Sequence, residues 1–241
     1  MNSYTPFMII RWLMMLLLVI VLVACDADEP AVLPPEEIVQ QTADHLNQLT
    51  GFHFIIERTG APAFLDPDGF IGFRSAEGDY VAPDKARAAV RVTIPGLVTD
   101  VSVISIGAVQ WQTNVVTGAW EELPPKWGFN PTVLFDPNIG LPAILQNHLT
   151  NLQLIGLEQL EEDGDDLLYK LTADVAGSAI YEMSGTLIGP DTVTAELWIT
   201  PDTFELVRIL VTEPVPDSDE PSLWQVDFSH FNQVVEIAPP V

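Results

Sequence analysis

The chain has 241 residues, 48% of them hydrophobic, and its 34 Asp and Glu residues against 9 Lys and Arg residues give a formal net charge of −25. This length suits one large domain or two small ones, and the hydrophobic fraction is enough for a sizeable core. The negative charge repels phosphate backbones and anionic headgroups. It therefore excludes nucleic acid as a partner and leaves no polybasic patch for binding a membrane.

An export signal is predicted at residues 1–24. Arg11 is followed by an uninterrupted apolar run from Trp12 to Ala24, which is too short for a comfortable bilayer span. The end of this run, LVAC at Leu22–Cys25, resembles a bacterial lipobox, so Cys25 is predicted to be lipidated and to become the N-terminus after cleavage. The alternative is an uncleaved anchor with an incidental cysteine, which would leave outside the cell a lone thiol able to pair only between chains.

Residues 25–35 are predicted to form an extended, solvated tether because they are acidic and rich in proline. A helix follows between Pro35 and Gly51, with Glu36 and Glu37 in its first turn. Its apolar stripe must pack against another element. The stripe consists of Ile38, Val39, Thr42, Ala43, Leu46 and Leu49.

Alternation of apolar and polar residues predicts half-buried antiparallel strands over most of the remaining chain. The alternating runs are 52–57, 90–94, 109–112, 167–175, 192–199, 207–211 and 224–228. Turn signals such as Pro95–Gly96 and Thr117–Gly118 separate the runs, so hairpins are the natural connections. We expect about ten strands in one large sheet with a single apolar face.

A second helical segment is predicted near Phe135–Gln153, where Asp136 can cap and Pro137 can occupy the first position. Pro142 inside it indicates two short helices with a break. Their shared face would be Ile144, Leu145, His148, Leu149 and Leu152. The fold class is then α+β, with one domain at residues 36–241 in which helices pack on one face of a strongly curved antiparallel sheet.

Two or three short helices are too few to cover the apolar face of such a sheet. Apolar residues on an inner sheet face usually form an ordinary core, but protein interiors are close-packed, so uncovered area must be filled by loops, a partner or a ligand. The mismatch makes a lipid-binding cavity a serious option. The predicted lining residues are Ile38, Leu46, Phe52, Phe54, Ile56, Val90, Val92, Ile94, Trp111, Phe135, Ile144, Leu145, Leu149, Leu171, Val193, Leu197, Val207, Ile209, Trp224 and Val226.

No catalytic, cofactor or metal site is predicted. The sequence has no G-x-S-x-G motif, and His45, His53, His148 and His230 are scattered without metal-ligand spacing. The acidic turns DPDG and EEDGDD lack the alternating ligands and distal Glu of an EF-hand loop, so solvated hairpin turns explain them better.

Several segments, in order along nearly the whole mature chain, carry a family resemblance. They are the lipobox at Leu22–Cys25, HLNQLTGFHF, GFIGFRSAEGDYVAPDKARAAVRV, TGAWEELPP, FDPNIGLPAIL and AELWITPDTFELVRILV. Together they resemble the LppX/LprA/LprF/LprG-type bacterial lipoprotein family. The resemblance implies a half-barrel sheet wrapped over helices around an apolar cavity, similar to the fold of the periplasmic lipoprotein carriers and sensors.

The resemblance also implies a function. A member would bind acylated lipids or glycolipids without catalysis and carry or present them at the outer side of the cytoplasmic membrane. Its N-terminal acyl anchor would hold it there, and a membrane transporter is a candidate partner. Two alternatives stay open: a lipid-anchored sensor or scaffold that binds a partner protein with the same fold, and an extracellular enzyme, for which no residue can be named.

Overall fold

The computed structural model describes residues 33–66, 68–123, 131–160, 166–181, 183–216 and 218–240. The predicted signal segment 1–24, the lipidation site Cys25 and most of the predicted tether 25–35 lie outside these residues. The described part of the chain from Pro34 onward belongs to one compact unit. Within it, no helix combines the length and the apolarity that crossing a bilayer requires.

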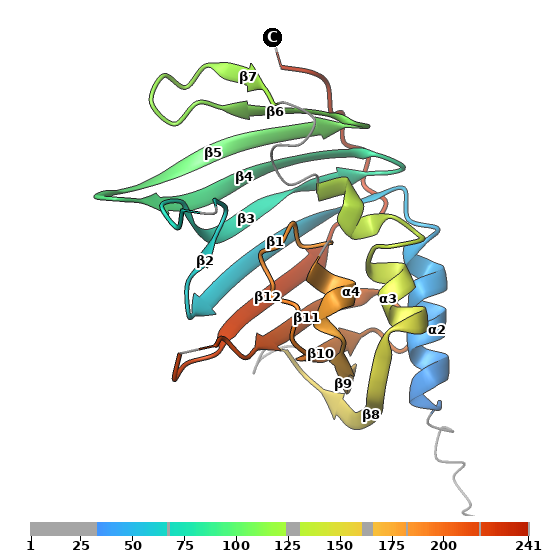
Figure 1. Cartoon of the computed structure of the whole chain (residues 1–241). Coiled ribbons are helices and arrows are strands. Elements are labelled where there is room, and N and C mark those ends of the chain that lie inside the picture. Colours follow the sequence, from blue (N-terminus) through green and yellow to red (C-terminus); the bar gives the residue numbers. More distant parts are fainter. Residues whose placement is uncertain are drawn as a thin grey trace, which may run out of the picture. The chain divides into compact units, whose positions relative to one another are not determined.

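Twelve antiparallel strands form one curved sheet in the order β7-β6-β5-β4-β3-β1-β12-β11-β10-β9-β8, and β2 pairs with β3 (Figure 1). The strands are β1 (Gly51–Gly60), β2 (Ala63–Phe64), β3 (Gly72–Val81), β4 (Lys85–Ile94), β5 (Leu97–Ile106), β6 (Val109–Thr113), β7 (Trp120–Glu122), β8 (Leu149–Glu158), β9 (Leu168–Val175), β10 (Val193–Ile199), β11 (Leu206–Glu213) and β12 (Ser222–Ser229). The predicted curved antiparallel sheet is confirmed. Its strand count exceeds the expected ten because β2 and β7, of two and three residues, are too short to show alternation.

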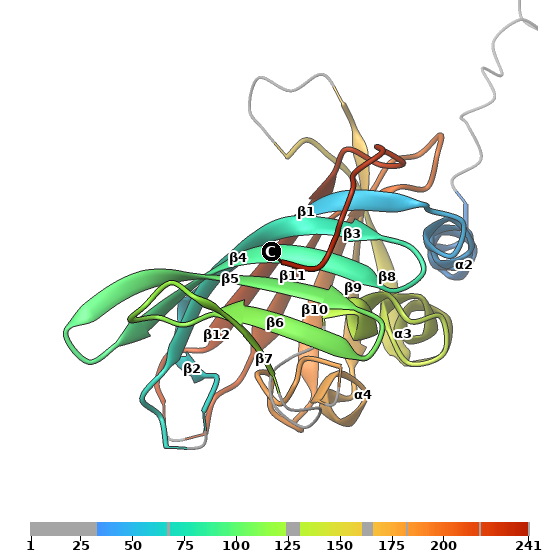
Figure 2. The ribbon, with the colours of Figure 1, turned by 90° about the horizontal axis from the view of Figure 1, so that it is seen from above.

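The first and last strands meet in the middle of the sheet. From β1 the chain winds outward through β3 to β7, and a connection containing η1 (Pro131–Phe135) and α3 (Leu141–Asn147) leads to β8 at the other edge. The chain then returns strand by strand to β12, which pairs with β1 from His53↔Ser229 to Gly60↔Ser222. Figure 2 shows the helices on the concave side of the sheet. The connection between the two edges therefore lies where it can cover part of the apolar face.

Helix α2 (Pro35–Leu46) begins where the sequence predicts, and its buried stripe faces α3. Leu46 is the last helical residue, and the backbone N–H of Asn47 closes the final turn on the carbonyl of Ala43. Thr42 is fully buried inside this stripe, and its hydroxyl donates to the carbonyl oxygen of Ile38 at 2.9 Å. The polar atom is satisfied within the helix, so burial of the threonine costs little.

The second helical prediction matches the structure only over Leu141–Asn147. Asp136 and Pro137 precede α3, whose N-cap is Gly140, and Pro142 lies in its first turn and does not break it. The prediction is also wrong after Asn147. Leu149 and Leu152 lie in β8, where Leu149 pairs with Val175 of β9. Register shifts interrupt this pairing twice, which hides the strand alternation and leaves spacing that looks helical. A further short helix, α4 (Gly177–Tyr181), packs on the concave side and was not predicted (Figure 1).

The two faces of the sheet differ in polarity. On the concave face, Phe54 pairs with Phe228 and Ile56 pairs with Val226. The convex face carries ion pairs, among them Arg87–Asp79 at 2.8 Å and Arg91–Asp100 at 2.8 Å. The convex face is therefore suited to solvent, and the concave face is suited to apolar contacts.

An apolar cavity as the candidate functional site

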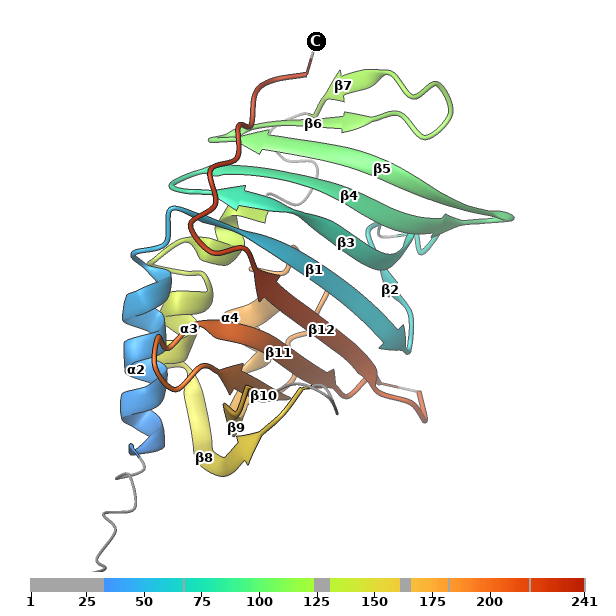
Figure 3. The ribbon, with the colours of Figure 1, turned by 180° about the vertical axis from the view of Figure 1, so that it is seen from behind.

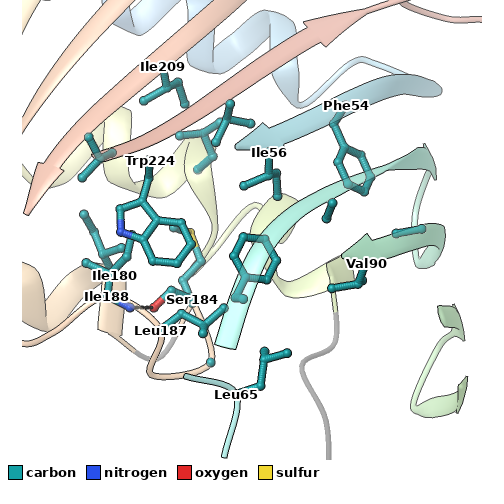
Figure 4. A pocket seen from close by; sticks show the side chains of 18 of the residues that line it. Phe54, Ile56, Leu65, Val90, Ile180, Ser184, Leu187, Ile188, Ile209 and Trp224 are labelled. Carbon is teal, nitrogen blue, oxygen red and sulfur yellow. Dashed lines mark hydrogen bonds between the residues drawn. The ribbon is translucent and has the colours of Figure 1, made fainter. Parts of the chain in front are cut away.

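A cavity of about 770 Å³ lies against the concave face of the sheet. Its walls come from strands across the sheet, from η1, α3 and α4, and from the segment Met183–Ile188 that follows α4. Figure 4 shows Ile56, Ile209 and Trp224 on the sheet and Leu187 and Ile188 on the opposite segment, all directed toward the same space. Ligand pockets in proteins commonly measure about 300–1,000 Å³, so this cavity can accommodate a ligand.

An aromatic cluster lies at the end of the cavity next to η1. The ring centroid of Phe135 is 4.5 Å from that of Phe52, 4.7 Å from that of Tyr80 and 6.3 Å from that of Phe228. Phe135 and Phe228 line the cavity, whereas Phe52 lies behind them. Edge-to-face and tilted contacts of this kind stabilise a rigid apolar wall.

Tyr80 connects this wall to the neighbouring turn. Its hydroxyl donates to the carbonyl oxygen of Pro83 at 2.9 Å. Burial, together with the smaller effect of the negative charges of Asp84 and Asp136, raises the pKa of Tyr80 to about 12. The phenol therefore stays neutral and remains a donor at physiological pH.

Glu213 fixes the wall on the α4 side. Its carboxylate is buried and accepts hydrogen bonds from the indole Nε1 of Trp224 at 3.0 Å and from the backbone N–H of Gly189 at 2.6 Å. In the same segment the hydroxyl oxygen of Ser184 accepts from the backbone N–H of Ile188 at 3.1 Å (Figure 4). The bond from Gly189 holds the segment after α4 against Glu213 of β11, and the bond between Ile188 and Ser184 lies within that segment.

Few polar side chains face the cavity. They are Asp66, Gln110, Gln112 and Ser184. The carboxylate of Asp66 accepts from the backbone N–H of Phe70 at 3.0 Å, and this bond is the main reason that the pKa of Asp66 lies below its usual value. A cavity with so few polar groups suits an apolar ligand whose polar part is contacted at only a few points.

The structure places many of the predicted lining residues on this cavity. They are Phe54, Ile56, Val90, Val92, Phe135, Ile144, Leu145, Leu149, Leu197, Ile209, Trp224 and Val226. They come from six strands, from η1 and from α3. Long-range strand pairing brings them together.

Other predicted residues do not line it, and each has a structural reason. Trp111 points to the opposite face of β6 from Gln110 and Gln112, which line the cavity in its place. A register shift next to Ile199 pairs that residue with Leu206, so Leu206 is fully buried and Val207 is displaced from the lining. Ile94 lies near the end of β4, beyond the last lining residue of that strand, Val92.

The remaining non-lining residues are buried in packed regions beside the cavity. They are Ile38, Leu46, Phe52, Leu171 and Val193. Ile38 and Leu46 belong to α2, which packs on α3 and not directly on the cavity. For these residues the ordinary-core interpretation describes the structure better.

Sequence reasoning missed the segment after α4 and part of β3 and β5. Met183, Leu187, Ile188, Phe73, Ala76, Val101 and Val103 all line the cavity. In β3, the register shift between Phe73 and Ser75 breaks the alternation that would have shown the strand. In β5, the alternation of Val101 and Val103 with Ser102 was a usable signal.

The histidines do not form a metal site among the described residues, where no cluster of three metal-binding side chains occurs. His53 lies on the convex face, with its Nδ1 at 3.0 Å from Asp79 Oδ1 and its Nε2 at 3.5 Å from Glu77 Oε1. The His53 and His230 rings meet at 5.7 Å between centroids.

Together, these features define the structural class of this protein: an α+β domain whose curved antiparallel sheet encloses an apolar cavity on its concave face. Comparison of the sequence with family models then identifies the family, because residues 34–237 match the LppX_LprAFG lipoprotein model. The chain belongs to this family. No curated protein sequence matches it significantly.

Solved structures of two mycobacterial lipoproteins share the fold. LprF from Mycobacterium bovis has a TM-score of 0.65 at 16% identity, and the match covers 86% of this chain and 96% of LprF. LppX from Mycobacterium tuberculosis has a TM-score of 0.60 at 21% identity, with 88% of this chain and 100% of LppX covered. These matches extend over nearly all of the described domain and support the fold.

Proposed function

We propose that this protein is a lipid-anchored lipoprotein that binds acylated lipids or glycolipids in its cavity. It would carry or present them at the outer side of the cytoplasmic membrane, without catalysis. The observation that carries this proposal is the cavity of about 770 Å³, whose lining is almost entirely aliphatic and aromatic.

The energetics favour acyl chains as the ligand. Each CH₂ group removed from water contributes about 0.8 kcal/mol, so one long chain gains affinity without any specific polar contact. The side chains of Gln110 and Gln112 can orient a headgroup by hydrogen bonds, and both are uncharged. Selectivity would then depend on the shape of the cavity and on these few contacts.

The anchor is proposed to be the acylated Cys25, preceded by the signal 1–24 and followed by the tether 25–35. Acyl chains are needed for attachment because the chain has 34 acidic against 9 basic residues. A transporter in the same membrane would be the partner that supplies or receives the lipid. A sensor or scaffold with the same fold would be expected to fill the cavity with its own side chains.

The test is the lipid content of the protein made in a bacterial host. We expect native mass spectrometry and lipid extraction to find acyl lipid bound in near-stoichiometric amount, and delipidated protein to take up a fluorescent fatty-acyl lipid. A mass spectrum of the N-terminal peptide tests acylation of Cys25 separately. Protein that carries no lipid and takes up none would contradict the proposal.

A further inference from the structure

Exposed apolar side chains gather at one end of the sheet, on three neighbouring connections. We call this group the tip surface. It consists of Phe64, Leu65, Phe70 and Ile71 around β2, Leu97 and Val98 at the β4–β5 turn, and Val115 and Val116 at the β6–β7 turn. Figures 1 and 3 show these connections at the end of the sheet away from α2 and α3.

The tip surface is continuous with the cavity. Leu65, Ile71 and Val115 are partly exposed and also line the cavity. Along β4 the cavity-lining Val90 and Val92 are followed by Ile94, which pairs with the half-exposed Leu97. Apolar side chains thus lead from inside the cavity to solvent.

The segments of the tip surface are nearly free of charge in a strongly acidic chain. Residues 92–99 and 113–119 contain no charged side chain, and the β2–β3 connection has only Asp66 and Asp68. Asp66 is engaged by the backbone N–H of Phe70. The next connection at this end, residues 214–221, contains three acids and adjoins Ala61, whose backbone N–H donates to Pro221 O at 3.1 Å.

We propose that the tip surface docks on a lipid bilayer with neutral or zwitterionic headgroups, so that the cavity opens onto the membrane. The exposed fraction of the side chain is 88% for Val116 and 61% for Phe70, which is unfavourable in water unless a surface covers them. Tip segments 61–73, 92–99 and 113–119 lack Arg, Tyr, Trp and Met, four of the five residue types that protein interfaces favour, and contain only the fifth, as Phe64, Phe70 and Phe73.

The charge distribution decides the kind of membrane and the orientation. The acidic connection 214–221 is repelled by anionic headgroups, so an anionic bilayer would oppose docking of the adjoining apolar tips. The membrane-contacting surface is a property separate from lipid binding, because it is the same whichever ligand the cavity holds.

Two exposed valines, one on the tip surface and one far from it, provide a matched test of docking on a bilayer. Val116 is on the tip surface, whereas Val234, 97% exposed, lies close to Asn232, which bonds Gly51 at the opposite end of β1. In the full chain carrying Cys25→Ser, a polarity-sensitive fluorophore is attached at Val116→Cys or at Val234→Cys, and the protein is reconstituted in phosphatidylcholine vesicles. We expect a blue shift at position 116 and quenching by spin-labelled lipid at least fivefold stronger than at position 234.

The remaining outcomes are equally decisive. Equal quenching at the two positions, or none at position 116, would overturn the docking proposal. A blue shift at position 116 that appears without vesicles and grows with protein concentration would assign the surface to a second copy of the chain. Docking at position 116 by protein that never contains lipid would support this inference while contradicting the proposed function.

A second pair of variants measures the consequence for transfer. Leu97→Asp with Val116→Asp places two charges on the tip surface, and we expect transfer of a fluorescent acyl lipid between phosphatidylcholine vesicles to slow at least tenfold. Val234→Asp should leave the rate unchanged. Uptake of the same lipid from detergent solution should be equal in all three proteins, and an unchanged transfer rate in the double variant would contradict docking.

Discussion

Glu213 of β11 accepts a hydrogen bond from the indole of Trp224 of β12, with 3.0 Å between Oε2 and Nε1, and both side chains are buried. The other carboxylate oxygen holds the backbone N–H of Gly189. Trp224 lines the cavity, and so does Ile188, which precedes Gly189 in the chain. One carboxylate therefore joins the sheet to the segment that closes the cavity on the α4 side.

Removing this carboxylate should destabilise the domain. Glu213→Ala leaves the buried indole N–H of Trp224 and the partly buried backbone N–H of Gly189 without partners, and we expect a loss of about 2–4 kcal/mol in the free energy of unfolding. Glu213→Gln keeps one acceptor and should cost about half as much. Urea unfolding measures both, with the exposed Glu220→Ala as the unaffected control. Equal losses for Ala and Gln would contradict the role of the two hydrogen bonds.

Filling the cavity should reduce lipid binding without unfolding the protein. Ala88 lines the cavity, whereas Ala89, its neighbour in β4, is exposed on the other face. We expect Ala88→Trp to lower the amount of bound acyl lipid at least fivefold, because the indole occupies space that the ligand needs. Ala89→Trp should bind as the wild type does. The measurement is the lipid-to-protein ratio after extraction, and equal ratios would argue against this cavity as the binding site.

The buried phenol of Tyr80 predicts a loss of stability at high pH. Its pKa is about 12 in the folded state and about 10 in the unfolded chain, so the neutral form favours folding. The contribution of the neutral Tyr80 phenol to the free energy of unfolding is complete below pH 10. It is lost as the pH rises from 10 through 12, and its total is on the order of 2 kcal/mol.

Tyr80→Phe provides the control for this pH dependence. The variant loses the hydrogen bond to Pro83, which should cost about 1 kcal/mol at pH 7. It should also lack the additional fall in stability between pH 10 and pH 12. Denaturant unfolding of both proteins at pH 8, 10 and 11.5 measures the difference, and parallel pH profiles would show that Tyr80 is not the responsible group.

Two glycines in the same strand should differ in how much stability an alanine costs. A Cβ at Gly78 would lie 2.0 Å from the backbone oxygen of Arg87 in β4, whereas a Cβ at Gly72 would meet nothing closer than 3.7 Å. Gly78→Ala forces β3 and β4 apart and should cost roughly 3 kcal/mol, while Gly72→Ala should stay within about 1 kcal/mol of wild type. Thermal unfolding of both variants measures this, and equal effects would contradict the close approach at Gly78.

The antiparallel class of the sheet and most of its strands follow from the pattern of apolar and polar residues alone. Alternation such as Phe52, Phe54 and Ile56 against His53 and Glu57 defines which face of β1 is buried, because side chains in a strand point alternately to the two faces. The same local rule located α2, whose stripe at three- and four-residue spacing is buried as expected.

Local pattern failed where the strand pairing shifts and where a strand turns its polar side chains toward the cavity. In β6 the alternation of Trp111 with Gln110 and Gln112 gave the strand correctly and the cavity face wrongly, because hydrophobicity alone does not say which side is concave. The register shift beside Ile199 displaced Val207, and those in β8 made a strand look helical.

The existence of the cavity and the place where it opens are visible only in the folded domain. The cavity depends on pairing of β1 with β12, almost the whole domain apart in sequence, and on the amount of concave surface that α3, α4 and the segment after α4 cover. Strand periodicity carries no information about curvature or uncovered area. These are set by long-range packing, which excludes water from some apolar positions and leaves others facing an open space.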